Sequence, residues 1–269
     1  MPETTVDGVR LAYDVIGDGP PVLLVCGTGQ PAVSWHLGTA QALASAGYTV
    51  VTFDNRGVPP SDAPPPPYTV ADMVGDAAGL LEALDLGPAR VAGLSLGALI
   101  TQELALARPD LVRAAVMMGT VGRANAMLRA WANGQLALAR LGVDLPPEYE
   151  AAVLAMQVVG APRQLDDAFV GPFVELAQGV EAWRGPGPEG QYAADAAYDD
   201  RLGALAGVRV PSLVIAFEHD LLTPPALGRE VAGAIPGARY VEVAGCGHLG
   251  PMEDPDAVLP LLVDFFAEV

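Results

Sequence analysis

The chain has 269 residues, 51% of them hydrophobic, and a formal net charge of −18. This length suits one α/β domain with an insertion, and a chain of this size can bury a large core. The acidic balance and the lack of any Lys/Arg cluster argue against nucleic acid and anionic membrane surfaces as partners, since both bind basic patches. A small-molecule substrate is the expected partner, for a monomer or a small homo-oligomer.

The beginning of the chain and its cysteines bear on its location. Residues 1–8 have neither a basic start nor an apolar run, so a secretory signal is not expected. No stretch approaches the ~18 continuous apolar residues of a membrane span. Cys26 and Cys246 are too few for a disulfide framework, although a bond between them or a Cys/His metal site is an open alternative. A cytoplasmic protein without metal or cofactor is expected.

Short apolar runs bounded by turn residues predict strands that are buried on both faces. After a loosely alternating segment at 9–15, such runs occur at 22–25, 48–53, 90–94, 114–118, 212–217 and 238–243. Helical patterns lie between them, at 69–86, 98–107 and 255–268. Strands that alternate with helices predict an α/β fold with a mostly parallel sheet and helices on both faces.

One region, from about residue 123 to about residue 191, has helical periodicity but no good strand. Helices are expected at 124–141, 147–159 and 166–183, with joints at Pro146-Pro147 and at the Gly185–Pro188 run. Because the region lies between two sheet strands, it is predicted to be a helical cap over one edge of the sheet. The expected division is a core of 1–122 and 192–269 and a cap of 123–191.

The strongest chemical signal is Gly93-Leu94-Ser95-Leu96-Gly97. It follows a predicted strand and precedes a predicted helix, which is the setting of a nucleophile elbow. The two glycines permit a sharp turn, and the helix N-terminus offers free N–H groups to a developing oxyanion. A G-x-S-x-G pattern also arises by chance in a glycine-rich chain, so its setting carries the prediction that Ser95 is the nucleophile.

A nucleophilic serine needs a base, and the chain has three histidines, at positions 36, 219 and 248. His248 lies in a glycine-containing loop after the last predicted strand, where it is free to reach Ser95. His36 is expected to pack or cap locally, and His219 to be a solvated turn residue. His248 is therefore the predicted general base.

The histidine in turn needs a carboxylate that fixes its tautomer and stabilises the imidazolium. Asp220 and Glu218 both follow the strand predicted at 212–217, at the same edge of the sheet as Ser95. Strand spacing alone does not separate these two candidates. The order Ser, Asp, His along the chain is the α/β-hydrolase order.

An oxyanion hole needs two backbone N–H donors. One is predicted to be the N–H of Leu96, directly after the nucleophile. The other is expected from the loop that follows the strand at 22–25, with Thr28 as first choice. The alternative is that this loop is only a turn.

These segments resemble the α/β-hydrolase superfamily, and within it the branch of non-haem haloperoxidase-like (perhydrolase) enzymes, enol-lactonases and small esterases. The resemblance is weaker over the cap and covers nearly the whole core, at 22–27, 53–57, 93–97, 214–220 and 247–248. It implies an α/β-hydrolase fold and favours Asp220 over Glu218 as the acid. It also implies that a haloperoxidase-type assay can detect activity through peracid formation. Cys26 stands where the family usually has His, and Pro59, where it usually has Gly, suggests a reshaped pocket rim.

The predicted function is a serine hydrolase of a small to medium, predominantly apolar and uncharged ester, lactone or related acyl compound. The candidate pocket wall combines a strand end with the inward faces of the cap, and consists of Met117, Met118, Trp131, Leu138, Met156, Phe169, Phe173 and Trp183. Such residues at helical spacing can also be ordinary core. Arg123 and Arg129 are the residues that could instead bind an anionic substrate.

Other functions of the same fold stay open at this point. They are a carbon–carbon bond hydrolase, a thioesterase, a cyclase of secondary metabolism, and a non-catalytic ligand-binding protein. The predicted Ser, His and Asp set weighs against the binding protein, whereas the fold alone does not separate any of these functions.

Overall fold

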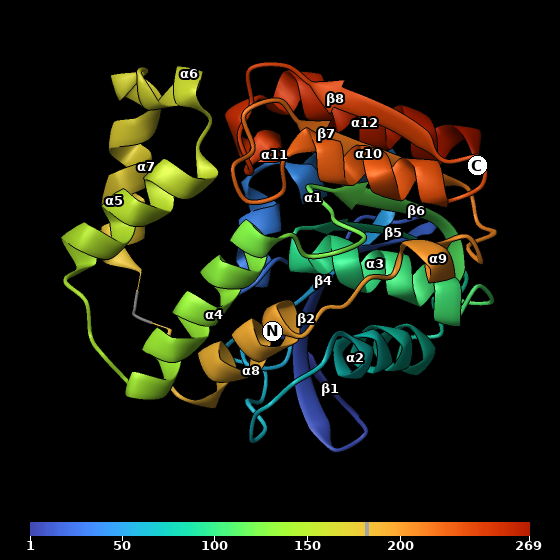
Figure 1. The fold of residues 1–269 in the computed structure, drawn as a ribbon. Coiled ribbons are helices and arrows are strands. Elements are labelled where there is room, and N and C mark those ends of the chain that lie inside the picture. The colour runs from blue at the N-terminus through green and yellow to red at the C-terminus, as the bar shows by residue number, and fades with distance from the viewer. Residues whose placement is uncertain (181–182) are drawn as a thin grey trace.

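The computed structural model describes residues 1–180 and 183–269 and consists of an eight-stranded sheet flanked by helices (Figure 1). The strand order is β1-β2-β4-β3-β5-β6-β7-β8. The strands are β1 (Glu3–Val6), β2 (Val9–Ile16), β3 (Pro21–Val25), β4 (Thr49–Phe53), β5 (Ala89–Leu94), β6 (Val112–Met118), β7 (Ser212–Phe217) and β8 (Arg239–Val243). All neighbours from β4 to β8 are parallel, whereas β1 and β2 form an antiparallel edge. The predicted α/β-hydrolase fold is confirmed.

The central strands are apolar throughout because both of their faces are covered. Every residue of β5 and β7 is buried, and side chains alternate between two separate hydrophobic cores. Leu23 and Val25 of β3 enter one core, whereas Val22 and Leu24 enter the other. The register of the sheet therefore determines which side chains point toward which helical layer.

One core is covered by α2 (Val70–Ala83), α3 (Leu96–Ala107), α9 (Leu202–Leu205) and α10 (Pro225–Ala234). The other core is covered by the short helix η1 (Ala32–Leu37), α1 (Thr39–Ser45) and α12 (Pro255–Glu268). Thr69 caps α2 through a reciprocal capping box with Asp72, which explains why this helix begins after a threonine. None of the helices in the two described ranges is both long enough and apolar enough to cross a membrane.

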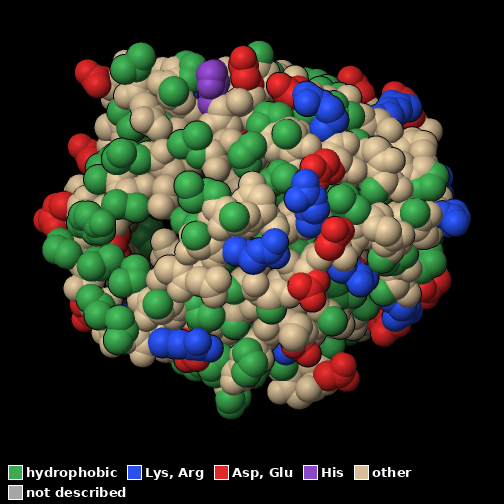
Figure 2. Space-filling model, viewed as in Figure 1, with side chains coloured by type: hydrophobic (Ala, Val, Ile, Leu, Met, Phe, Trp, Pro, Cys, Tyr) green, Lys and Arg blue, Asp and Glu red, His purple; other side chains and the backbone are tan. Residues whose placement is uncertain are grey.

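Among the described residues, five of the six helices between β6 and β7 form the insertion, residues 126–196. They are α4 (Ala126–Leu141), α5 (Pro147–Val158), α6 (Ala161–Gln164), α7 (Asp167–Gly179) and α8 (Pro186–Ala196). Figure 1 shows α5 and α7 side by side at the left, whereas α4 and α8 pack together across the core. Large exposed apolar side chains gather on this part, and Figure 2 shows them around a hollow at the left.

The insertion differs from the prediction at its second half. The Gly185–Pro188 run was expected to be a joint, but α8 begins inside it, because proline fits the first turn of a helix. The expected boundary at residue 191 therefore falls inside α8. The helix expected at 166–183 ends at Gly179, and residues 181–182 lie outside the described residues.

Candidate active site

Ser95 lies at a sharp turn between β5 and α3. Its φ and ψ are 58° and −122°, a conformation that residues with side chains rarely adopt and that is held by the surrounding structure. A Cβ at Gly93 would lie 2.0 Å from the carbonyl oxygen of Gly97, and a Cβ at Gly97 would lie 2.1 Å from that of Val25. The Ser95 N–H donates to the carbonyl of Met118 at 3.0 Å. The two glycines are therefore required by close backbone contacts.

His248 and Asp220 are joined by a hydrogen bond of 2.7 Å between Nδ1 and Oδ2. His248 follows β8 and Asp220 follows β7, so both lie at the carboxyl edge of the parallel sheet. Thr223 donates to the Asp220 carboxylate from its hydroxyl at 2.6 Å and from its N–H at 2.9 Å, and the N–H of Leu222 donates at 2.9 Å. These donors fix the carboxylate in one orientation against the imidazole ring.

The two members of this pair shift each other's pKa. Burial by itself would raise the pKa of Asp220, but the charge and hydrogen bond of His248, with the donors from Thr223, hold that pKa below its ordinary value. Burial by itself would lower the pKa of His248, but the charge and hydrogen bond of Asp220 raise it above its ordinary value. The imidazole is therefore a stronger base than a free histidine.

Glu218, the other candidate acid, lies on the outside of the same region. Its Oε2 accepts a hydrogen bond from the N–H of Gly245 at 2.9 Å and lies 3.7 Å from Nε2 of His219. His36 lies elsewhere, with its Nε2 at 3.2 Å from the hydroxyl of Thr52. Of the two carboxylates, Asp220 is the one that contacts the ring of His248.

Gly119, directly after β6, shows how Ser95 and the His248–Asp220 pair come together. A Cβ at Gly119 would lie 3.3 Å from Asp220 Oδ2 and 3.3 Å from His248 Cε1. Gly119 also lines a cavity of about 40 Å³ together with Ser95 and Thr223. Ser95 therefore shares this cavity with Gly119 and Thr223, two residues that touch the His248–Asp220 pair.

The two predicted oxyanion donors belong to the same cavity. Thr28 and Leu96 both line it, and a Cβ at Gly27 would lie 3.3 Å from the Cβ of Ser95. Neither the N–H of Thr28 nor that of Leu96 donates to another described residue. Both groups are thus available to an atom that enters the cavity beside Ser95.

The predicted pocket residues divide into two groups. Trp131 lines the cavity, whereas Trp183 does not line it and instead packs against Gly29, where a Cβ would be 2.7 Å from the indole ring. The others do not line the cavity, namely Met117, Met118, Leu138, Met156, Phe169 and Phe173. Met156 is 65% exposed, and Phe169 and Phe173 pack in a separate small cluster with α5. Met118 instead supports the serine turn through its carbonyl.

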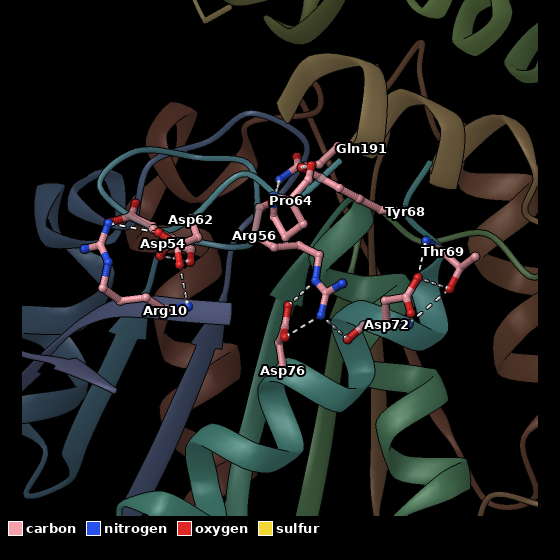
Figure 3. A network of polar contacts seen from close by, with 11 residues as sticks. Arg10, Asp54, Arg56, Asp62, Pro64, Tyr68, Thr69, Asp72, Asp76 and Gln191 are labelled. Carbon is pink, nitrogen blue, oxygen red and sulfur yellow. Dashed lines mark hydrogen bonds and ion pairs between the residues drawn. The ribbon is translucent and has the colours of Figure 1, made fainter. Parts of the chain in front are cut away.

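The loop of residues 26–29 is held by α8 of the insertion, which the sequence did not predict. Gln191 is fully buried, and its Oε1 accepts from the N–H of Gly29 at 2.8 Å. Its Nε2 donates to the carbonyl of Arg56 at 2.8 Å, and Arg56 forms a two-pronged ion pair with Asp76 at 2.5 and 2.7 Å (Figure 3). The 26–29 loop is thereby connected through α8 to α2 of the core.

Asp195, one helical turn after Gln191, is a second unexpected member of the site. It lines the cavity, and its Oδ2 accepts from the hydroxyl of Thr28 at 2.8 Å. Burial raises the pKa of Asp195 to about 7, while the Thr28 hydrogen bond opposes this shift. The spacing of four residues places both side chains on one face of a helix, but this signal was hidden because no helix was expected there.

The loop of residues 244–249, which carries His248, is held by Glu253. This buried carboxylate accepts from the N–H of Gly247 at 3.0 Å and from the N–H of Gly160 at 2.8 Å. Gly160 belongs to the insertion, and a Cβ at Gly247 would lie only 2.3 Å from its nitrogen. Burial is the main cause that raises the pKa of Glu253. The insertion therefore touches both loops beside Ser95.

Both cysteines are free, so the alternative of a disulfide between them is wrong. Cys26 lies in the core on the side of α12, where burial raises the pKa of its thiol. Burial also raises the pKa of Cys246, to about 11. Within the described ranges, no three side chains of His, Cys, Asp or Glu are grouped as metal ligands would be.

The fold and this site define the class of the protein. The family model of the α/β hydrolase fold matches residues 20–255, and the chain belongs to this family.

The relatives agree with this assignment. The chain is 39% identical over 261 residues to a candidate non-heme bromoperoxidase, BpoC, of Mycobacterium tuberculosis, covering 97% of this chain and 99% of the relative. The crystal structure of BpoC from strain H37Rv matches with a TM-score of 0.91 and 38% identity over 96% of each chain. A candidate carbamate hydrolase, RutD, of Azorhizobium caulinodans is 32% identical over 100% of this chain and 99% of its own. The enol-lactonase structure from Burkholderia xenovorans LB400 matches with a TM-score of 0.81 and 29% identity, over 99% of this chain and 100% of that one.

Proposed function

We propose that the protein is a serine hydrolase in which Ser95 is the nucleophile, His248 the general base and Asp220 the acid that orients the histidine. The observation that carries this proposal is the cavity at the ends of β5, β6 and β7, which Ser95 shares with residues that touch the His248–Asp220 pair. The alternative binding function would not need such a hydrogen-bonded pair beside a strained serine turn. The names of the relatives, a hydrolase and a lactonase among them, point to acyl chemistry.

The reaction follows from the positions of these groups. Neutral His248 takes the hydroxyl proton of Ser95 as the serine oxygen attacks the carbonyl carbon of the substrate. The carbonyl oxygen becomes an oxyanion, which the N–H groups of Thr28 and Leu96 stabilise. The leaving alcohol receives the proton from His248, and the acyl group remains on Ser95. Water then loses a proton to His248 and attacks the acyl carbon. The acid is released when the bond to Ser95 breaks and His248 returns the proton to the serine oxygen.

The substrate class is a small to medium acyl compound that is mainly apolar and carries no negative charge. The cavity wall is mostly apolar, with Leu99, Val121, Leu128, Trp131 and Leu222 among its residues. The net charge of −18 disfavours the approach of acidic carriers and coenzyme A thioesters at low salt. Arg123 forms an ion pair with Glu230 at 2.6 Å, which leaves it poorly placed to bind an anion.

Because it covers the carboxyl edge of the sheet, the insertion acts as a cap in this proposal. Trp131 of α4 and Asp195 of α8 supply part of the wall, so this half of the insertion selects the substrate. The carbon–carbon bond hydrolase, thioesterase and cyclase remain competing functions for the same site. Turnover of carboxylate-bearing analogues or acyl-coenzyme A in clear preference to neutral esters would favour the thioesterase.

The test requires no knowledge of the natural substrate. A fluorophosphonate probe should label the protein, and peptide mapping should place the label on Ser95. Ser95→Ala should abolish labelling and lower hydrolysis of p-nitrophenyl butanoate by about 10³-fold or more, since loss of a nucleophile costs several orders of magnitude. Ser45→Ala, at an exposed serine of α1, is the matched control and should change neither. Retention of a tenth of the activity in Ser95→Ala would disprove the mechanism.

A further inference from the structure

The cavity beside Ser95 contains one carboxylate among the lining residues that the structure describes, and that residue is Asp195. Most of the wall is apolar, so a carboxyl group stands out chemically at this position. It plays no part in the serine mechanism proposed above, because Asp220 already contacts His248. A role for Asp195 must therefore come from its own contacts.

The hydrogen bonds around Asp195 leave one of its two oxygens free. Oδ2 accepts from the Thr28 hydroxyl at 2.8 Å, whereas Oδ1 receives no hydrogen bond from the described residues. Of the other polar side chains of the wall, two hydroxyls are used elsewhere, whereas the buried indole N–H of Trp131 has no hydrogen-bond partner among the described residues. The Tyr198 hydroxyl donates to Glu103 at 2.8 Å, and the Thr223 hydroxyl donates to Asp220 at 2.6 Å. No arginine forms an ion pair with Asp195 within the described ranges.

A free acceptor in a confined apolar site has a preferred ligand. An acceptor without a partner in a mostly apolar wall favours a donor that reaches it, whereas a methyl group at the same place gains nothing. Burial raises the pKa of Asp195 to about 7, so the ionised form rejects an anionic group and both forms can hydrogen-bond a hydroxyl or an N–H. The chemistry thus selects a hydrogen-bond donor without negative charge.

We propose that Asp195, held by Thr28, forms a substrate subsite that binds a hydroxyl or N–H group on the acyl part of the substrate. This inference rests on the proposed function and deepens it. The acyl part is assigned to the cavity because it stays bonded to Ser95, which lines the same cavity as Asp195, after the alcohol has left. The test therefore uses esters whose donor is one or two carbons from the carbonyl carbon.

The simpler alternative is that Asp195 only holds the 26–29 loop through Thr28. Loss of that role would lower kcat/KM for every ester alike, because the oxyanion donor of the loop takes part in the hydrolysis of all of them. A subsite instead changes the ratio between two esters that differ only in the donor. Gln191 supplies the matched control, since it holds the same loop through Gly29 and does not line the cavity.

The experiment compares the kcat/KM of matched p-nitrophenyl esters. One pair is the 3-hydroxybutanoate and the 3-methylbutanoate, and the other is the 2-hydroxypropanoate and the 2-methylpropanoate. We expect the wild-type protein to prefer at least one hydroxy ester over its methyl isostere by about tenfold or more, since sites built around a hydroxyl discriminate strongly. Asp195→Leu should abolish or reverse this preference, whereas Asp195→Asn, which keeps an acceptor, should retain part of it.

The controls separate the possible failures. Gln191→Leu should lower kcat/KM for both members of a pair equally. If thermal unfolding shows that Asp195→Leu does not fold, Asp195→Ala takes its place in the comparison. If the wild-type protein shows less than twofold preference in both pairs, or if the preference survives in Asp195→Leu, the subsite is disproved. If the wild-type protein is neither labelled by fluorophosphonate nor hydrolyses any ester, the proposed function itself has failed.

Discussion

The two loops that flank Ser95 are held in place by different parts of the molecule. The 244–249 loop is held mainly by carboxylates of the core, with Asp220 on the ring of His248 and Glu253 below it. The first half of the 26–29 loop is held from the core, by Asn55 and Gln30, whereas Thr28 and Gly29 are held by Asp195 and Gln191 of the insertion. The predicted base thus depends on the core, whereas the predicted oxyanion donor at Thr28 depends in addition on a helix of the insertion.

This difference implies that the insertion does more than enclose a substrate. A donor N–H must lie within hydrogen-bond distance of the developing oxyanion, and a small displacement weakens its contribution. Because α8 is anchored to the 26–29 loop and to Arg56, it positions that donor as well as part of the wall. Substitutions that affect the 244–249 loop and those that affect the 26–29 loop are therefore expected to lower kcat by different amounts.

The largest loss of kcat is expected from a substitution of the carboxylate that contacts His248. Asp220→Asn should lower kcat by ~10⁴-fold, because asparagine keeps the shape but stabilises the wrong tautomer of His248. Glu218→Gln is the control, since glutamine still accepts from the N–H of Gly245, and it should change kcat by less than about fivefold. Steady-state hydrolysis of p-nitrophenyl butanoate measures both. Equal losses, or a larger loss in Glu218→Gln, would transfer the acid role to Glu218.

A smaller loss of kcat is expected from a substitution that loosens the 26–29 loop. Gln191→Leu removes the acceptor for Gly29 and the donor to Arg56, so the 26–29 loop loses its anchor at Gly29. We expect kcat to fall about 10- to 100-fold with little change in KM, since the loss concerns the transition state. Gln178→Leu, at an exposed glutamine of α7, should leave kcat unchanged. A rise in KM alone would indicate a binding role for Gln191.

The pH dependence reports the coupling between His248 and Asp220. The base is active when neutral, so kcat/KM should rise with pH through the pKa of His248, which lies above its ordinary value because Asp220 favours the imidazolium. In Asp220→Asn this charge is lost, and the midpoint should move to lower pH by about one unit or more. Residual activity of the variant, followed from pH 5 to 9, provides the measurement. A midpoint that moves upward would contradict the assigned pair.

The smallest effect is expected from the half of the insertion that stands away from the site. Met156 is 65% exposed on α5, so Met156→Gln should leave kcat/KM within about twofold of the wild-type value. Trp131→Ala removes part of the cavity wall and should raise KM several-fold for the same ester. Comparable losses in the two variants would show that α5 also contacts the substrate.

Local patterns predicted the fold and the serine turn well. The buried strands read as apolar runs because both faces are covered, and the turn at Ser95 needs glycine at two fixed positions. The edge strand β1 was not predicted, because it is short and largely exposed. A sequence pattern also does not tell which face of an insertion helix meets the core, which explains why Met156 and Phe173 were grouped with Trp131.

The anchoring residues escaped prediction for a different reason. Gln191 and Asp195 contact residues more than 130 positions away, so no local pattern connects them with the 26–29 loop. Their helix was also concealed by the Gly185–Pro188 run, whose composition is typical of a joint. The role of Glu253 also escaped prediction. It depends on the fold, which brings Gly160 of the insertion against Gly247 so that Glu253 accepts from both N–H groups.

The contact between Gly160 and Gly247 also constrains how such a protein can diversify. The two backbones meet there without room for a methyl group, next to the predicted base His248, so this contact fixes the insertion against the 244–249 loop. Variation in α4 can alter the cavity wall, and α5 and α7 can vary outside it, while this contact stays intact. We therefore expect libraries that randomise residues 126–158 and 167–179 to yield folded variants far more often than libraries that include position 160.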